Sequence, residues 1–311
     1  VKHVAQTGTL NPKDVTVPGV FIDAIVVCDN PWEDHRQTSS WYFDPSYCGQ
    51  LRVPQGNIEP VLFNERKFIA RRGTMELYPG AVINLGTGIP NDMVGKVCNE
   101  ERVSEDVMIT VESGIYGGVQ AGGIDFGIGQ NLYAMIGHHE QMDYYNGAGV
   151  DITYMGLGEL DEMGNVNSTK MGPRCTGAGG FIDITQNAKK VVFLGTFTTG
   201  GARYRFENGR LVILEEGKIR KMVRQVAQIS FNGPLAREKR QPVFIVTERA
   251  VFELREEGVV LTEIAPGIDL KTQVLDMMDF KPIVNRDLKE MDKRLFIQDG
   301  PFGLKEQMIQ C

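Results

Sequence analysis

Glu112 is the residue whose surroundings most favour chemistry. It ends the apolar segment Val107–Glu112 and is followed at once by Ser-Gly-Ile-Tyr-Gly-Gly and then by Val-Gln-Ala-Gly-Gly-Ile-Asp-Phe-Gly. A carboxylate is a weak nucleophile in water, but it attacks an electrophilic carbonyl when the two groups are held close together in the right orientation. The same carboxylate could instead cap a turn, and its spacing alone leaves both interpretations open.

Glycine is concentrated around this carboxylate. Of the 36 glycines, 23 lie between Gly86 and Gly201. Glycine costs backbone entropy on folding and is kept where the chain needs positive φ or where the backbone must approach a ligand closely. We therefore interpret the glycine-rich region as several ligand-facing loops, with ordinary turns as the alternative.

Two common phosphate-binding patterns are incomplete here. Six residues separate Gly88 from Gly95, where a P-loop has four, so a P-loop is excluded. The segment Gly86-Thr87-Gly88 supplies two glycines of a dinucleotide fingerprint, but Asn91 stands where the third glycine is needed for close helix packing. A dinucleotide-binding oxidoreductase therefore remains only as an alternative.

Other catalytic motifs and metal sites are not indicated. The segment Val111–Ile115 lacks the glycines that flank the serine of a nucleophile elbow. His138 and His139 are adjacent and belong to no H-E-x-x-H motif, so they are expected to be surface residues. The five cysteines contain no C-x-x-C pair, which predicts neither a zinc site nor a disulfide framework; they are Cys28, Cys48, Cys98, Cys175 and Cys311.

The periodicity of apolar residues predicts a β-α-β unit around the candidate nucleophile. It consists of the strand Ala81–Gly86, a helix over Pro90–Cys98 and the strand Val107–Glu112, and an earlier helix is expected within Phe63–Gly80. Further strands are expected at Ile152–Tyr154, Val191–Leu194, Leu211–Leu214, Val243–Thr247 and Val259–Ile264, and a helical tail around Leu288–Leu295. In open α/β sheets ligands bind beyond the carboxyl ends of the strands, where both glycine-rich segments begin.

The first 58 residues differ from the rest. They contain one predicted strand, Val20–Val27, followed by an aromatic and polar stretch without periodicity. Such a long irregular stretch is uncommon inside a compact domain and indicates a linker. The net charge of −7 argues against a nucleic-acid surface, and the apolar runs are far shorter than the roughly 20 residues that cross a membrane, so we expect a cytoplasmic protein.

Four segments together resemble a known family. They are Asn84–Pro90 (NLGTGIP), Glu112–Gly127 (ESGIYGGVQAGGIDFG), Asn165–Lys170 (NVNSTK) and Gly177–Ile184 (GAGGFIDI). In this order and spacing the chain resembles the C-terminal, β-type half of the family I coenzyme A transferases, particularly the fused acetate, propionate or acetoacetyl type. The segment Asn11–Val27 is similar to the part that closes the first half of the fused enzyme.

The resemblance implies a fold and a domain division. We expect an open three-layer α/β/α sheet of the CoA-transferase type over residues 59–311. Residues 1–58 would be the tail of the N-terminal CoA-transferase domain plus a linker. Much of that first half would then be missing from this chain, although the active site of the family lies between the two halves.

The resemblance also implies roles for individual residues. The glutamate that matches Glu112 is the nucleophile of the family. Contacts to CoA or to the reacting carbonyl would come from Asn84, Gly86, Gly88, Gly179, Gly180 and Phe181. The acyl pocket would be shaped by Gly117, Gly118, Gly122, Gly123 and Phe126.

The implied activity is ping-pong transfer of CoA between short-chain acyl groups, through a glutamyl anhydride and a Glu112-CoA thioester. An acyl-CoA and a short-chain carboxylate would be the substrates, and no cofactor or metal beyond CoA itself is expected. The partners would be the N-terminal half of the same enzyme and further copies in a homo-oligomer. Three alternatives remain open: hydrolysis of acyl-CoA by the same glutamate, the dinucleotide-binding oxidoreductase and a non-catalytic subunit or fragment.

Overall fold

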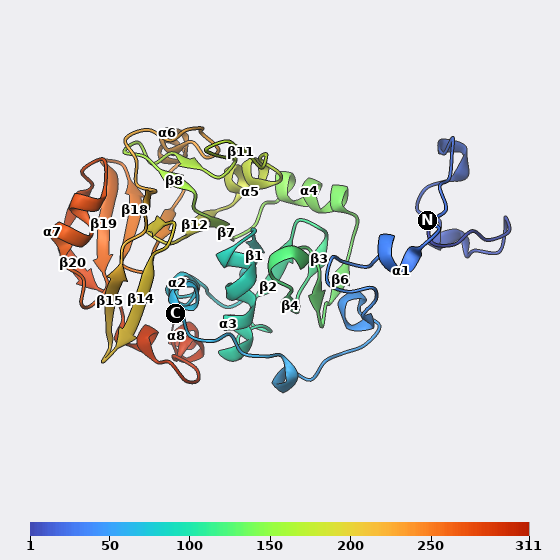
Figure 1. Cartoon of the computed structure of the whole chain (residues 1–311), viewed down its shortest axis with the longest axis horizontal. Coiled ribbons are helices and arrows are strands. Elements are labelled where there is room, and N and C mark those ends of the chain that lie inside the picture. Colours follow the sequence, from blue (N-terminus) through green and yellow to red (C-terminus); the bar gives the residue numbers. More distant parts are fainter. Residues whose placement is uncertain (311) are drawn as a thin grey trace. The chain divides into compact units, whose positions relative to one another are not determined.

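The computed structural model describes residues 1–310, so the prediction that concerns Cys311 lies outside the described residues. The chain divides into two compact units, Val1–Pro45 and Ser46–Cys311. Figure 1 shows the helices and strands of both units. The second unit contains the sheet, the glycine-rich region and Glu112.

The first unit contains short turns and no strand among its described residues. Its elements are the 3-10 turns Pro12–Asp14 and Gly19–Phe21 and the single-turn helix α1 (Pro31–Asp34). The predicted strand Val20–Val27 is wrong for this chain, since Val20 and Val26 are 85% and 80% exposed and no strand lies beside them. A strand needs a neighbour for its backbone N–H and C=O groups. The hydrogen bonds described for this segment and its end are those of the turn at Gly19–Phe21 and those of Val1 with Val26 and Cys28.

A ten-stranded sheet forms the middle of the second unit. Five parallel strands lie at its centre, in the spatial order β17 (Val243–Val246), β12 (Lys190–Leu194), β7 (Ile152–Gly156), β1 (Val82–Leu85) and β2 (Met108–Val111). Antiparallel β3 (Ile115–Tyr116) and β6 (Ala134–Met135) extend the sheet beyond β2. On the other side follow β18 (Ala250–Arg255), β19 (Gly258–Ile264) and β20 (Ile283–Glu290).

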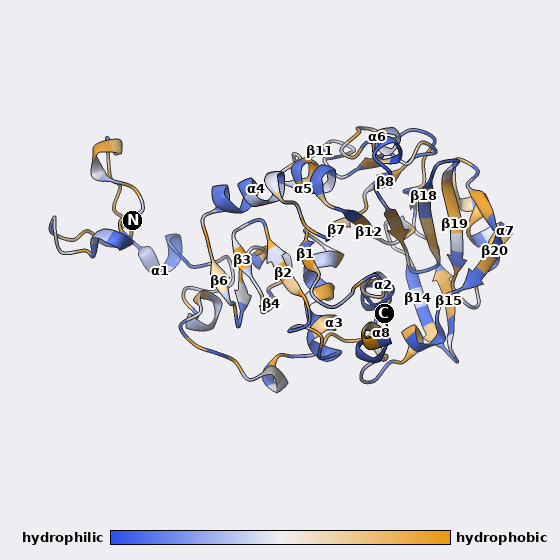
Figure 2. Cartoon of the chain, turned by 180° about the vertical axis from the view of Figure 1, so that it is seen from behind, coloured by the Kyte–Doolittle hydropathy of each residue, from blue (hydrophilic) through white to orange (hydrophobic). Residues whose placement is uncertain are grey.

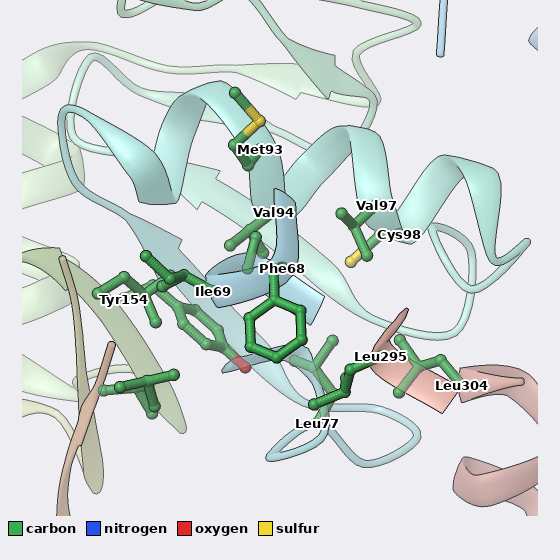
Figure 3. Packing of buried hydrophobic residues seen from close by; sticks show 14 of the residues in the cluster. Phe68, Ile69, Leu77, Met93, Val94, Val97, Cys98, Tyr154, Leu295 and Leu304 are labelled. Atoms are coloured by element: carbon green, nitrogen blue, oxygen red, sulfur yellow. The ribbon is translucent and has the colours of Figure 1, made fainter. Parts of the chain in front are cut away.

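Helices α2 (Glu65–Thr74), α3 (Gly95–Glu100) and α8 (Leu304–Gln310) cover one face of the sheet. Figure 3 shows Phe68 of α2 in the apolar cluster that also contains Val94, Tyr154 and Leu295. Helix α2 begins at Glu65 because the Asn64 side chain accepts a hydrogen bond from the N–H of Lys67 at 2.9 Å. It is shorter than the segment predicted to contain it. The predicted helix Pro90–Cys98 consists of a π-helical turn, Pro90–Val94, and α3.

The opposite face is covered by α4 (His138–Gly147), α5 (Phe181–Asn187) and α6 (Gly233–Glu238). Side chains alternate between the two faces along each strand, so Met155 packs on this side and Tyr154 on the other. The expected three-layer α/β/α architecture is therefore confirmed. Figure 2 shows α4 as mainly hydrophilic, which agrees with the burial of only Gln141 and Tyr145 from this helix.

Five two-stranded ladders lie outside the main sheet. The predicted strand Leu211–Leu214 exists, but β15 (Arg210–Glu215) pairs with β14 (Arg203–Glu207) in one of these ladders. The others pair β4 (Val119–Gln120) with β5 (Gly129–Gln130), β8 (Glu159–Leu160) with β9 (Val166–Asn167), β10 (Lys170–Met171) with β11 (Arg174–Cys175), and β13 (Thr198–Thr199) with β16 (Ile219–Arg220).

The predicted helical tail around Leu288–Leu295 is wrong. Strand β20 pairs with the edge of β19 and runs to Glu290, and a 3-10 turn follows at Lys293–Phe296. The short helix α7 (Leu270–Gln273) lies between β19 and β20. Pairing with an available sheet edge therefore outweighs the local preference for helix.

Residues 46–58 belong to the second unit, and the side chains of Gln130 and Asn131 bind parts of this stretch. The Val53 N–H donates to Asn131 Oδ1 at 2.8 Å, and Asn131 Nδ2 donates to the Val53 carbonyl at 2.8 Å. Gln130 Nε2 also donates to Ser46 Oγ at 2.9 Å. The division between the compact units thus lies at Pro45–Ser46, whereas the boundary at 58/59 stays a prediction about the domains of a longer enzyme.

Candidate active site

A cavity of about 410 Å³ lies at the carboxyl ends of the central parallel strands. Its wall is formed by the residues that follow β1 and β2, by the end of β7 and the two residues after it, by residues just before and in β10, and by the segment that leads into α5. These are Gly86, Thr87, Glu112, residues 155–158, Ser168, Met171 and residues 176–181. The location is the one expected for a ligand in an open α/β sheet.

Glu112 follows β2 directly, and its side chain is half-buried. Burial raises the pKa of this carboxyl group, and the nearby His138 lowers it in part. Within the described residues the Glu112 carboxylate takes part in no hydrogen bond and no ion pair. Its lone pairs are therefore not engaged by donors of the chain, and burial removes part of the hydration that weakens a carboxylate as a nucleophile.

The loop Gly177–Gly180 lies against this carboxylate. A Cβ at Gly180 would stand 3.2 Å from Glu112 Oε2 and 3.1 Å from Ile184 Cδ1, so glycine allows the close approach. Gly179 has a φ of +52°, a conformation that glycine adopts without strain. In the described part of the chain no acceptor binds the backbone N–H of Gly179 or Gly180, and Phe181 begins α5 with its side chain in the core.

Gly86 and Gly88 are glycine for different structural reasons. At Gly86 an added Cβ would stand 2.5 Å from Met155 Sδ and 3.2 Å from the Tyr154 carbonyl oxygen, so glycine lets the end of β1 lie against β7. Gly88 has a φ of +87° in the turn that precedes the π-helical segment. Gly86 lines the cavity, and Gly88 lies just outside its wall.

Asn84 lies beneath the cavity and not on its wall. The side chain is fully buried, with Thr153 Oγ1 donating to its Oδ1 at 2.9 Å and its Nδ2 donating to the Tyr145 hydroxyl at 3.0 Å. Thr110 Oγ1 donates its hydrogen to the Ile83 carbonyl, so it must accept a hydrogen bond from the Tyr145 hydroxyl. The two hydroxyl oxygens are 2.8 Å apart. Direct contact of Asn84 with CoA stays a prediction that this geometry does not favour.

Tyr145 belongs to this buried network, and its phenol is close enough to Glu112 for the charge of the carboxylate to affect it. Burial, together with the weaker effect of the Glu112 charge, raises the pKa of Tyr145 to about 12, although hydrogen bonds to Thr110 and Asn84 act to lower it. One turn earlier on α4, Gln141 is also fully buried, and neither its Nε2 nor its Oε1 forms a hydrogen bond of good geometry among the described residues. The Gln141 amide nevertheless lies near the Tyr145 and Tyr116 hydroxyl groups and lowers the pKa of both. The polar groups below Glu112 are therefore ordered but not fully satisfied.

The residues predicted to shape an acyl pocket lie in the hairpins after Glu112, away from the cavity wall. Gly117, Gly118 and Gly123 have positive φ, and at Gly122 an added Cβ would stand 2.8 Å from Asp92 Oδ1. Phe126 packs against a small apolar cluster around Val111. The geometry explains why these positions are glycine or apolar, and their predicted role in acyl binding stays a prediction.

Sequence reasoning missed several residues of the cavity wall. Met155 and Leu157 lie at the end of the buried strand β7 and just after it. Met171 lies in the β10–β11 hairpin, which the sequence did not indicate. Ser168 belongs to the Asn165–Lys170 segment that carried the resemblance, and its Oγ donates to the Gly156 carbonyl at 2.9 Å. That segment was the available signal, although no role had been assigned to it.

No three His, Cys, Asp or Glu side chains in the described part of the chain are gathered so that they could hold a metal ion. No helix within residues 1–310 combines the length and apolar character needed to cross a membrane.

Comparison with known proteins identifies the family, although no family model matches the chain. Caffeate CoA-transferase of Acetobacterium woodii is 42% identical over 304 residues, which are 95% of this chain and 57% of that protein. Acetate CoA-transferase YdiF of Escherichia coli K12 is 40% identical over 97% of this chain and 56% of its own length. The acetate CoA-transferase subunit beta of Haemophilus influenzae is 30% identical, and the match covers 73% of this chain and 96% of that subunit. The chain belongs to the CoA-transferase family.

Solved CoA-transferase structures agree with this result. The acyl-CoA transferase YdiF from E. coli O157:H7 matches with TM-scores of 0.81 for a thioester complex with CoA and 0.84 for the apoenzyme, at 38% identity. Glutaconate CoA-transferase from Acidaminococcus fermentans, at 19% identity and a TM-score of 0.58, shares the fold. The expected resemblance to the β-type half is confirmed, and the chain spans a little over half the length of the first two curated relatives.

Proposed function

We propose that this chain supplies the nucleophile of a short-chain acyl-CoA:carboxylate CoA-transferase and that Glu112 is this nucleophile. The observation that carries the proposal is a half-buried carboxylate with no hydrogen bond in the described structure, lying on the wall of a cavity at the ends of β1, β2 and β7. The relatives described above, a caffeate CoA-transferase and an acetate CoA-transferase, support the same reaction class.

In the first half-reaction the Glu112 carboxylate attacks the thioester carbonyl of the acyl-CoA. The carbon–sulfur bond breaks, CoA leaves as a thiolate, and a mixed anhydride joins the acyl group to Glu112. The thiolate then attacks the glutamyl carbonyl, and the acyl group leaves as its free carboxylate. The product is a Glu112-CoA thioester, so the energy of the original thioester is retained in the enzyme.

In the second half-reaction another carboxylate reverses both steps. It attacks the Glu112 thioester and expels the CoA thiolate, which then attacks the acyl carbonyl of the new anhydride. The new acyl-CoA leaves and the Glu112 carboxylate is restored. CoA acts as a substrate throughout, and we propose no further cofactor or metal.

Each attack places negative charge on an oxygen next to the nucleophile. We assign the free N–H groups of Gly179 and Gly180 as donors to that oxygen, because Gly180 already lies beside Glu112 Oε2. Loss of one such donor typically slows an acyl-transfer enzyme by about 100- to 1,000-fold. Asn84 would then act from below, through Tyr145, by ordering the floor of the site.

The complete enzyme would contain a partner half. The curated relatives are almost twice as long as the matched region, and the first unit of this chain exposes large apolar side chains such as Val20, Phe21 and Trp32. We assign these side chains to contacts with the N-terminal half of the enzyme, in which Val20–Val27 would pair as a strand. Self-association and a cytoplasmic location stay predictions.

Isotope exchange tests the proposed reaction. The complete enzyme is incubated with acetyl-CoA and labelled acetate in the absence of any other acid. Ping-pong transfer predicts that label enters acetyl-CoA, because the first half-reaction is reversible. Glu112→Gln should abolish the exchange, whereas Glu162→Gln, at an exposed position outside the cavity, should leave it unchanged.

The alternatives predict different results. A hydrolase that uses the same glutamate would release free CoA without exchange, and added acetate would not accelerate turnover. An oxidoreductase would retain a nicotinamide dinucleotide through purification. Undiminished exchange in Glu112→Gln would refute the assignment of the nucleophile.

A further inference from the structure

The cavity at Glu112 has four bulky apolar side chains in its wall. Met155, Leu157 and Phe181 belong to the buried core and are at most 8% exposed. Met171 is half-buried and belongs to none of the core clusters of the described residues. It is therefore the one bulky apolar wall residue, among those described, whose size can change without leaving a hole in the core.

The backbone that carries Met171 is held firmly. Asn167 Oδ1 accepts hydrogen bonds from the N–H groups of Thr169 and Lys170 at 3.1 Å, and Asn167 Nδ2 donates to the Lys170 carbonyl at 2.7 Å. Met171 also pairs with Arg174 across the β10–β11 hairpin. The Met171 side chain thus extends from a fixed position.

Gly158 leaves room for this side chain. A Cβ at Gly158 would stand 1.8 Å from Met171 Cε and 3.0 Å from Met171 Sδ. Gly158 lies just after β7 and lines the cavity too, so the end of the Met171 side chain packs against another residue of the cavity wall. Methionine is unbranched and flexible, which suits a contact that must adjust to different ligands.

We propose that Met171 limits the size of the acyl group that this site accepts. The inference rests on the proposed CoA-transferase function. The three other bulky wall residues are fixed by core packing, so Met171 is the apolar wall residue that can set the room available in this cavity. A smaller side chain at this position is then expected to admit larger acyl groups.

Substitutions that shrink and enlarge this side chain test the proposal in the complete enzyme. The probes are acetate, butyrate and benzoate as acceptors, with kcat/KM measured for each. Met171→Ala should raise the benzoate-to-acetate ratio by about 10-fold or more, because even one methylene in an apolar pocket changes specificity by that amount. Met171→Phe should change the butyrate-to-acetate ratio in the opposite direction.

The control is Met163→Ala, which makes the same change at a 45% exposed methionine in the β8–β9 turn, outside the cavity. It should leave all ratios unchanged. Equal thermal unfolding midpoints for the Met171 variants and the parent would show that packing is preserved.

Two results would overturn the proposal. Unchanged ratios in both Met171 variants would show that Met171 does not limit the acyl group. An equal change in KM for every acyl-CoA, with the ratios constant, would assign Met171 to binding of the CoA portion. Either result leaves the proposed function intact if labelled acetate still exchanges, whereas absence of exchange in the parent enzyme would refute the proposed function and this inference together.

Discussion

At the scale of single residues, the proposed function depends on a carboxylate for which the described residues supply no hydrogen-bond donor. The position of Glu112 at the carboxyl end of a strand could be predicted because its signal is local, whereas its role as nucleophile came from the family resemblance and stays a proposal. The surroundings of Asn84 could not, because its partners Thr153 and Tyr145 are distant in sequence and meet it only in the folded sheet. Met171 was missed for the same reason, since nothing in its neighbours indicates that it reaches the end of β7.

The raised pKa of Glu112 predicts that its charge destabilises the fold. A carboxyl group whose pKa is higher in the folded than in the unfolded chain lowers stability above the folded pKa and has no effect below the unfolded pKa. Glu112→Gln should therefore raise the thermal unfolding midpoint at pH 7, and the gain should shrink as the pH falls through the carboxyl range. Equal midpoints of parent and variant at every pH would contradict a raised pKa.

The unpaired amide of Gln141 predicts a gain in stability on its removal. A buried polar group without a partner costs about 1 to 3 kcal/mol, and methionine has a similar shape without that cost. Gln141→Met should raise the free energy of unfolding by about 1 kcal/mol in denaturant titrations. Gln50→Met, at an exposed position, serves as the control and should change little. A loss of stability in Gln141→Met would show that the amide is satisfied in solution.

At the scale of elements, the central strands were predicted because buried parallel strands are apolar runs bounded by glycine and polar residues. Helix α5 was not, because the glycines of Gly177–Gly180 suggest a turn and give no sign that a helix follows. The helix predicted around Leu288–Leu295 was wrong because β20 takes its conformation from pairing with β19. Element identity was therefore predictable where it depends on local pattern and not where it depends on a neighbour.

We expect the stability of the loop that carries Met171 to depend strongly on Asn167. This side chain is fully buried and forms hydrogen bonds with Thr169, Lys170 and Glu159. Asn167→Ala leaves several of these groups without partners, so it should lower the free energy of unfolding by about 2 kcal/mol or more. Hydrogen exchange of residues 168–176 should also accelerate. The exposed Asn57→Ala should do neither, and an unaffected loop in Asn167→Ala would contradict this account.

At the scale of the whole molecule, the sequence identified the family from four motifs and predicted the three-layer sheet. The sequence predicted the first unit only in part. Its composition suggested a strand and a linker, whereas residues 1–45 form short turns with exposed apolar side chains. A strand at the edge of a sheet requires that sheet. The proposed strand Val20–Val27 would therefore form only when the proposed partner half supplies a neighbouring strand.

If the proposed partner half pairs with the first unit, it should protect the backbone of residues 20–27 from hydrogen exchange. Backbone N–H groups of residues 20–27 should exchange rapidly with solvent in this chain alone and slowly in the complete enzyme, because a paired strand satisfies them. The β12 segment Lys190–Leu194, buried in the central sheet, should be protected in both samples. Rapid exchange of residues 20–27 in the complete enzyme would contradict the proposed pairing.

The central claim is tested most directly by the mass of the peptide that contains Glu112. The complete enzyme is incubated with acetyl-CoA alone, digested, and analysed by mass spectrometry. The account predicts a CoA adduct on Glu112 that borohydride reduces and that added acetate discharges. Release of free CoA with no adduct on this peptide, or an adduct on another residue, would contradict it.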